Sequence, residues 1–300
     1  MTAIGLTTAT AAAPAHVTAA SGEPWRRAVR RLVKRRGAMV GIVVVLFFVL
    51  VAVAAPLIAP YDPVATSWSA VRKPPSLEHW FGTDEIGRDV LSRVIFGARA
   101  SLLAGVVSVC ISLACGLPIG LVSGYVGGFL DGLLMRITDA LLACPFLILA
   151  IALAAFLGPS LTNAMIAIGI SAMPAFIRLT RAQVLNAKVE DYVEAARAVG
   201  NPHRRIVLRH ILPNILAPIM VQATLAIAAA IIAEASLSFL GLGQQPPAPS
   251  WGSMLNTAKN FLDQAPWMAM WPGAAIFSLV LAFNLFGDGL RDALDPRHRG

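Results

Sequence analysis

The residue types that most often do chemistry form no catalytic or metal-binding pattern in this chain of 300 residues. His203 and His210 are the only close pair of histidines, and no carboxylate or thiol joins them. Cys110, Cys115 and Cys144 all fall in apolar stretches, where three cysteines predict neither a disulfide framework nor a metal site. We interpret the cysteines as small packing residues, and no Ser/His/Asp set or paired carboxylates indicate an enzyme.

One carboxylate stands apart because it lies inside an apolar run. Glu234 is near the end of the run 214–236, with Ser236 and Ser238 close by. Ionisable groups inside a membrane-crossing helix are candidates for function. We interpret Glu234 as a structural hydrogen-bonding residue. The alternative is that these three side chains belong to a gate or a transport path.

A polar segment, 194–213, lies between two apolar runs and carries strong helix punctuation. Gly200 suits the left-handed position that ends a first helix, predicted over 189–199. Asn201 is a good N-cap and Pro202 fits the first helical position, so a second helix is predicted to start at once. The proline at the end of the segment is expected to stop this second helix.

Both predicted helices have one apolar and one charged side. In the first, the two sides are Val189, Val193, Ala196 and Val199 against Glu190, Asp191, Glu194 and Arg197. In the second, they are Ile206, Val207 and Ile211 against Arg204, Arg205 and Arg209. We interpret the segment as a rigid element that docks in a groove of a soluble partner. The alternative is a helix that rests on lipid headgroups.

The composition predicts an all-α membrane protein. Hydrophobic residues make up 57% of the chain and charged residues 13%, about half the charged share of soluble domains. Six windows of ~20 apolar residues are long enough to cross a bilayer. They are 38–60, 101–125, 137–158, 160–180, 214–236 and 267–287.

The placement of basic residues predicts the orientation. With the N-terminus inside, eighteen of the 24 Lys and Arg residues fall in inner segments. Basic residues concentrate in cytoplasmic loops, so both termini and the segment 194–213 should be cytoplasmic. The net charge of +8 is therefore a signal of topology and not of nucleic-acid binding.

The remaining segments flank or join these spans. Residues 1–24 are rich in Ala and Thr and predict a disordered tail. Residues 25–37 form a basic amphipathic collar, and 288–300 a short cytoplasmic tail. A core of five transmembrane helices is predicted over 101–287, including the loop 188–213.

The outer segment 61–100 joins the first two spans. From 83 to 102 its apolar residues lie on one helical stripe, which predicts an interfacial helix running into the second span. Thr83 is the expected cap, and Asp89 with Arg93 is an expected i,i+4 pair.

Glycines recur at every fourth position of the second span. They are Gly116, Gly120, Gly124 and Gly128. Small residues at this spacing let two helix backbones approach closely in lipid, so tight packing against another helix is predicted here.

The polar segment resembles the EAA loop of ABC-importer permeases. It has Glu194-Ala195-Ala196, then Gly200, then Leu212-Pro213. One position departs from that pattern, since His210 stands where an isoleucine is usual.

Further stretches resemble the peptide/nickel (dipeptide and oligopeptide) importers, and among these the C-type permease. They are 79–93, which resembles the signature GTDxxGRDxxSR, 234–252 after the fifth span, and 282–296. The resemblance covers roughly residues 26–300.

The resemblance implies the type I ABC-importer permease fold, with six transmembrane helices in the bacterial cytoplasmic (inner) membrane. The implied partners are a second permease in a heterodimer, two cytoplasmic ATPases and an extracytoplasmic solute-binding protein, with lipid and no nucleic acid around the chain. No cofactor is expected here. The chain lacks a G-x-x-x-x-G-K-[ST] loop, so ATP and Mg²⁺ would be bound by the ATPases.

The resemblance also implies that 188–213 couples the chain to the ATPases. The implied coupling residues are Glu194, Ala195, Ala196, Gly200, Asn201, Pro202, His203, Arg204, Arg205, Ile206, Leu212 and Pro213. Glu194 is expected to fix the pair of short helices, and Gly200 to permit the bend between them.

The implied cargo is a short peptide or a related small solute, such as glutathione or a nickel chelate. An ion-coupled secondary transporter is the first alternative, and it needs coupling carboxylates near the middle of the membrane. A membrane-embedded hydrolase is the second. It needs a base inside the spans, whereas all five histidines fall outside them.

Overall fold

The computed structural model describes residues 24–294, so the predicted N-terminal tail and residues 295–300 lie almost wholly outside it. The described part of the chain is helical, with one isolated antiparallel bridge between Thr83 and Asp89. The longer helices are α1 Pro24–Lys34, α2 Arg36–Ile58, α3 Val90–Val126, α4 Gly128–Ala143, α5 Phe146–Leu157, α6 Leu161–Ala187, α9 Leu212–Phe239 and α11 Trp267–Leu294. The shorter ones are η1 Trp68–Ala70, α7 Asp191–Ala198, α8 His203–Arg205, η2 Ile206–Ile211, α10 Trp251–Ala258 and η3 Lys259–Phe261.

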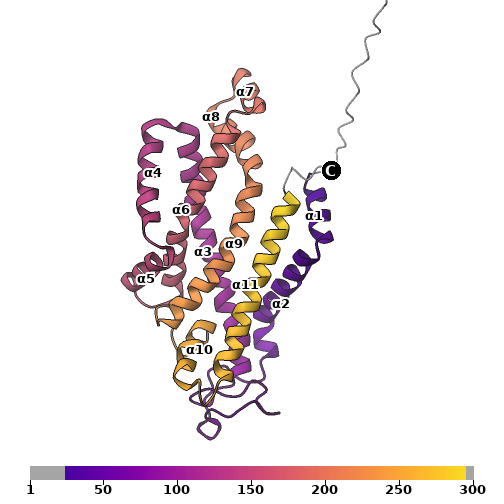
Figure 1. Cartoon of the computed structure of the whole chain (residues 1–300), viewed down its shortest axis with the longest axis vertical. Coiled ribbons are helices and arrows are strands. Elements are labelled where there is room, and N and C mark those ends of the chain that lie inside the picture. The colour runs from indigo at the N-terminus through magenta and orange to yellow at the C-terminus, as the bar shows by residue number, and fades with distance from the viewer. Residues whose placement is uncertain (1–23, 295–300) are drawn as a thin grey trace, which may run out of the picture.

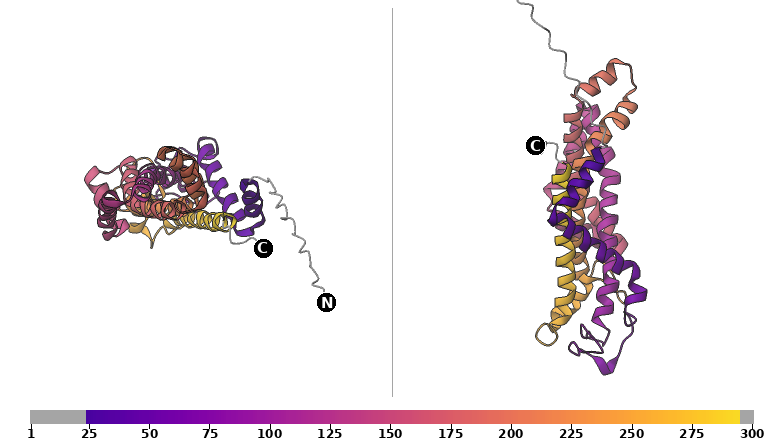
Figure 2. Two further views of the ribbon diagram at one scale, coloured as in Figure 1. Left: turned by 90° about the horizontal axis from the view of Figure 1, so that it is seen from above. Right: turned by 90° about the vertical axis from the view of Figure 1, so that its right-hand side faces the viewer.

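The long helices run up and down between two ends of the molecule (Figure 1). At one end lie α1, the turn between α3 and α4, and the pair α7 and α8. The other end carries the segment before α3 and the helix α10. Two views at right angles show a flattened bundle, with α1 and α2 at one edge and α4 and α5 at the other (Figure 2).

Five described helices are long and apolar enough to cross a membrane, and the bent pair of α4 and α5 counts as a sixth crossing if the two helices form one broken span. The five are α2, α3, α6, α9 extended back to His203, and α11. The predicted single helix over 137–158 is wrong, because α4 and α5 meet at 90°. The bend is at Cys144–Pro145, where Cys144 is extended (ψ 128°) because a residue before proline avoids the helical region.

Three of the four predicted glycines form a close seam between α3 and α6. A Cβ atom on Gly116, Gly120 or Gly124 would lie 2.6–2.9 Å from the Cβ of Phe176, Thr180 or Val184 respectively. The fourth, Gly128, has no such neighbour within 4 Å, because α3 ends at Val126 and the chain turns away. The seam therefore joins the second crossing to the fourth.

The predicted helix over 83–102 begins only at Val90. Residues 83–89 form a tight turn instead, in which Gly87 has a φ of +80°. Asp89 is the N-cap, and its carboxylate accepts a hydrogen bond from the Ser92 backbone N–H at 2.8 Å. The predicted continuity with the second span is confirmed, since α3 runs without a break from Val90 to Val126.

Two apolar cores hold the bundle together. One fills the space between α3, α5, α6 and α9 and contains the fully buried Phe176 and Ile168. The other lies between α2, α3, α9, α10 and α11 and is centred on Trp251, whose indole N–H donates to the Val94 carbonyl at 2.9 Å. The first core supports the end that carries α7 and α8, while the second fixes α10 at the opposite end.

Some helices extend beyond the predicted spans. The fourth crossing continues to Ala187 and the sixth to Leu294, so residues 288–294 of the predicted tail are helical. The basic collar forms α1, and Arg35 beside it pairs with Asp292 of α11 at 3.0 Å. These extensions carry the bundle past the apolar windows at the end where α7 and α8 lie.

Candidate functional site

The polar segment forms two short helices that pack against each other. Val193 and Ala196 of α7 are buried, together with Ile206 and Ile211 of the π-helical turn η2, in one shared cluster. Val199 and Val189, predicted for the same buried side, are instead 83% and 67% exposed. The pair is thus packed onto the first apolar core of the bundle, and it leaves other apolar side chains uncovered.

A left-handed glycine makes the bend between the two helices. Gly200 has a φ of +82°, which L side chains rarely adopt, as the sequence predicts. The predicted role of Asn201 is wrong. Its carboxamide donates to the Ala196 carbonyl at 3.1 Å and so caps the end of α7, and Pro202 holds the N-cap position of α8.

The second short helix does not stop at Pro213, contrary to the prediction. The π-helical turn η2 passes directly into α9, so one helical rod runs from His203 to Phe239. The wider π turn places a bond from the Leu212 N–H to the Val207 carbonyl just before Pro213. Proline lacks a backbone N–H, but at the start of α9 no helical hydrogen bond depends on that N–H. The rod therefore continues through Pro213. Movement of this short helix is therefore tied directly to a membrane crossing.

The predicted coupling residues differ widely in exposure. Buried members are Ala196 and Ile206; half-buried ones are Asn201 and Leu212; exposed ones are Glu194, Ala195, Gly200, Pro202, His203, Arg204, Arg205 and Pro213. Glu194 has no hydrogen-bond partner for its side chain within 24–294. This chain alone therefore gives no support for the expectation that Glu194 fixes the helix pair. His210, the position that departs from the family pattern, is half-buried.

One contact that sequence reasoning missed connects this unit to the bundle. The Tyr125 hydroxyl lies 2.7 Å from Nδ1 of His203 and joins the end of α3 to the start of α8. The two residues are separated by 78 positions, so no local pattern could have revealed the pair. In α7, burial and the nearby Glu190 carboxylate raise the pKa of Tyr192, so its hydroxyl stays protonated at neutral pH.

Ion pairs clamp α4 to α6 near the same end. Arg181 makes two bonds to the Asp131 carboxylate, at 2.6 and 2.7 Å, and Arg178 bonds to Asp139 at 2.6 Å. Asp139 thus links α4 to α6. The bidentate pair fixes the inner half of the bent crossing.

Glu234 lies fully buried where α9 meets α3. Its two carboxylate oxygens accept hydrogen bonds from Ser101 at 3.2 Å and Ser238 at 2.6 Å. The backbone N–H of Gln244 donates in turn to the Ser238 hydroxyl at 3.1 Å. Ser236 is half-buried on another side of α9 and bonds only to the Ile232 carbonyl. The geometry favours the structural interpretation of Glu234 and Ser238.

The segment before α3 contains a buried network of charges. Arg88 bonds to Asp84 at 2.5 Å and to Glu85 at 2.6 Å, while Arg93 pairs with Asp84 at 3.5 Å and not with Asp89 as predicted. Burial, together with the neighbouring Asp84, raises the pKa of Glu85. The network holds the outer segment against the start of α3.

Known proteins with similar sequences support this architecture. Residues 116–300 match the family described as binding-protein-dependent transport system inner membrane component, and residues 23–75 match the N-terminal TM domain of oligopeptide transport permease C. The chain is 48% identical over 274 residues to the dipeptide transport system permease protein DppC of Alkalihalophilus pseudofirmus, covering 91% of this chain and 90% of that protein. It is 50% identical over 278 residues to the glutathione transport system permease protein GsiD of Shigella flexneri, covering 92% of each.

Solved structures show the same fold. An inward-facing structure of the MetNI methionine ABC transporter aligns with a TM-score of 0.54 at 22% identity, over 68% of this chain and 96% of its own. A second crystal form aligns with a TM-score of 0.56 at 20% identity.

Fold and sequence together define a transport permease with the all-helical type I ABC-importer fold, a multi-pass membrane protein and not an enzyme. The chain belongs to the binding-protein-dependent transport system inner membrane component family.

Proposed function

We propose that this chain is one of two permease subunits in an ATP-driven importer of short peptides, in the range from dipeptides to glutathione. The permeases named above, at 48% and 50% identity, are for dipeptide and glutathione. A second permease would complete the path, a solute-binding protein would deliver the cargo outside, and two ATPases would bind ATP and Mg²⁺ in the cytoplasm. The chain would lie in the bacterial inner membrane with both termini cytoplasmic.

The single observation that carries this proposal is the exposed surface of the unit formed by 188–213. The buried residues of this unit join the first apolar core of the bundle, yet Val199 and Leu208 are 83% and 48% exposed, as are Arg204 and Arg205. Apolar side chains rimmed by charge at the end of a rigid rod are typical of a docking surface. ATPase subunits are the partner class that this family membership implies.

Coupling follows from the continuity of the rod. ATP would stabilise one arrangement of the ATPase pair over another, and only such a preference can shift the permease between its two states. Because α8, η2 and α9 are one helix, a shift of the docked end moves a membrane crossing without an intervening flexible joint. The residues of the docked unit bind the ATPases and transmit their movement to the rod, and none of these residues is catalytic.

Charge reversal at Glu194 tests the proposal. Glu194 is exposed, so Glu194→Lys should insert and fold normally but abolish peptide uptake by vesicles that contain the full complex and internal ATP. Gly200→Pro should do the same, because proline cannot adopt a φ of +82°. Asp288→Lys is the matched control, an exposed charge reversal near the same end, and should transport at the wild-type rate.

Normal uptake by both Glu194→Lys and Gly200→Pro would refute the coupling role of 188–213. Uptake that needs no ATPase subunits and follows an imposed ion gradient would support the alternative, an ion-coupled secondary transporter.

A further inference from the structure

One face of α9 is incompletely covered along most of its length. Its members recur at intervals of three or four residues: Gln222, Leu225, Ala229, Ile232, Ser236 and Leu240. All six are exposed or half-buried, whereas Ala228, Ile231 and Leu237 on other sides of the helix are buried. This face, called the open face below, runs from Gln222 to Leu240. From Gln222 to Ser236 it spans about 21 Å at the helical rise, roughly two-thirds of a bilayer's hydrocarbon.

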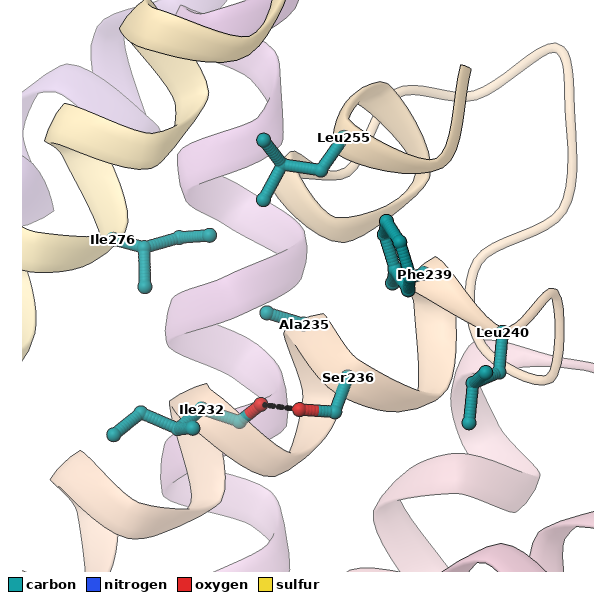
Figure 3. Close-up of a pocket in the computed structure, with 7 residues that line it drawn as sticks. All are labelled: Ile232, Ala235, Ser236, Phe239, Leu240, Leu255 and Ile276. Atoms are coloured by element: carbon teal, nitrogen blue, oxygen red, sulfur yellow. Dashed lines mark hydrogen bonds between the residues drawn. The ribbon is translucent and has the colours of Figure 1, made fainter. Parts of the chain in front are cut away.

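Two cavities open on this face. The first, of about 300 Å³, lies among α3, α4, α5, α6 and α9, and Gln222, Leu225 and Ala229 contribute to its wall. The second, of about 310 Å³, is lined by Ile232, Ser236 and Leu240 of α9, with Leu255 of α10 and Ile276 of α11 (Figure 3). The open face therefore borders hollow space from the middle of the bundle to its outer end.

Gln222 is the side chain on this face that needs a partner. The two serines of the same cavity are satisfied, since Ser108 donates to the Met165 carbonyl at 3.0 Å and Ser171 to the Ala167 carbonyl at 2.8 Å. No hydrogen-bond partner for the Gln222 carboxamide lies within residues 24–294, although it lines the cavity. An amide facing hydrocarbon without a partner is strongly unfavourable. Its partner is therefore water, a bound molecule or the second permease.

We propose that the open face is this chain's side of the translocation path, and that the Gln222 carboxamide hydrogen-bonds to the backbone of the passing peptide. This inference rests on the proposed function and assigns residues to it. A carboxamide both donates and accepts, which matches a peptide unit. The open face carries no charged side chain, so it selects for the shared backbone of short peptides and tolerates different side chains.

The open face also separates the three residues that the sequence suggested for a gate or transport path. Of Glu234, Ser236 and Ser238, only Ser236 lies on it. Glu234 and Ser238 are buried against α3 and bond to each other and to Ser101. They hold the outer end of α9 in place and do not contact cargo.

Cysteine accessibility tests the open face in the whole transporter. After Cys110, Cys115 and Cys144 are replaced by Ala, single variants Gln222→Cys, Ala229→Cys, Ile232→Cys and Ser236→Cys are treated with a charged, membrane-impermeant thiol reagent. All four should react, because the path holds water. Leu46→Cys on α2 is the matched control: Leu46 and Ile232 are 54% and 49% exposed, yet the control should not react, because it faces lipid.

If the four variants react no faster than Leu46→Cys, the open face is covered by lipid or by the second permease and the proposal is wrong. That outcome leaves the proposed function intact as long as the cysteine-free complex still takes up peptide with ATP.

Transport by Gln222 variants tests the contact itself. Gln222→Leu, of similar size and without hydrogen-bonding groups, should raise the KM for a labelled dipeptide about tenfold. Gln222→Asn should restore part of the affinity. An unchanged KM in Gln222→Leu would overturn the contact. Failure of the unmodified complex to transport the dipeptide or glutathione would instead refute the proposed function.

Discussion

Glu85 shows how burial changes the behaviour of a single charged residue outside the membrane. One carboxylate oxygen accepts from Arg88 at 2.6 Å, and the other is buried without a hydrogen-bond partner among the described residues. Burial and the adjacent Asp84 outweigh the nearby arginines, so the pKa of Glu85 is raised. Ionisation of Glu85 is therefore less favourable in the folded state than in the unfolded chain. It lowers the free energy of unfolding at any pH where the unfolded chain is ionised.

Replacement of this carboxylate should give a pH-dependent gain in stability. Below pH ~4.5, the ordinary pKa of Glu, both states are protonated and Glu85→Gln should melt like the wild type. As the pH rises from about 4.5 to the raised pKa, the wild type loses stability relative to Glu85→Gln, and above the raised pKa the difference stays constant. Thermal melting in mild detergent from pH 4 to pH 8 measures this, with the exposed Glu78→Gln as a control. A difference that shrinks toward pH 8 would contradict the assignment.

At the scale of elements, the seam between α3 and α6 depends on the absence of side chains. A Cβ on Gly120 would lie 2.6 Å from the Cβ of Thr180 and 2.7 Å from the Ile177 carbonyl oxygen. Neither neighbour can move without displacing the α6 backbone. Because lipid offers no hydrophobic driving force between helices, close backbone packing is a main source of attraction here.

A matched pair of glycine substitutions isolates this contribution. Gly120→Ala should lower the free energy of unfolding by roughly 1–3 kcal/mol, the usual cost of overpacking. Gly132→Ala in α4 meets nothing within 4 Å and should be neutral or stabilising by roughly 0.5–1 kcal/mol. Melting temperatures in detergent would show the two effects. Equal melting of both variants would mean that α3 and α6 separate more easily than the seam implies.

At the scale of the whole molecule, the bundle is polarised. The unit at 188–213, the α3–α4 turn and α1 lie at one end, and the charged network before α3 lies at the other (Figure 1). The first end carries most of the basic residues, which favours a cytoplasmic location.

Reporter fusions test this orientation. A phosphatase that is active only outside the cytoplasm should be inactive when fused after Gly200 and active when fused after Pro247, because the rod from His203 to Phe239 crosses the membrane between them. A fluorescent protein that folds only in the cytoplasm should give the opposite result. Reversal of both signals would invert the topology and place the docking surface outside.

Features set by neighbours in the chain could be predicted from the sequence, because their physical causes are local. Five of the six apolar windows, the left-handed turn at Gly200 and the close packing of three of the four spaced glycines are of this kind, and the structure has these. The family resemblance also came from the sequence. The sequence predicts a docking surface at 194–213, but it does not show that Val199 of this segment is exposed.

Tertiary structure decided the features that depend on contacts between distant residues. Ser101 meets Glu234 across 133 positions, Tyr125 meets His203 across 78, and Arg93 turns to Asp84 although Asp89 is one helical turn away. The bend between α4 and α5 and the open face of α9 arise in the same way. A helical pattern shows which residues share a face, but only the packed neighbours determine which face is covered, because burial is a property of the assembled bundle.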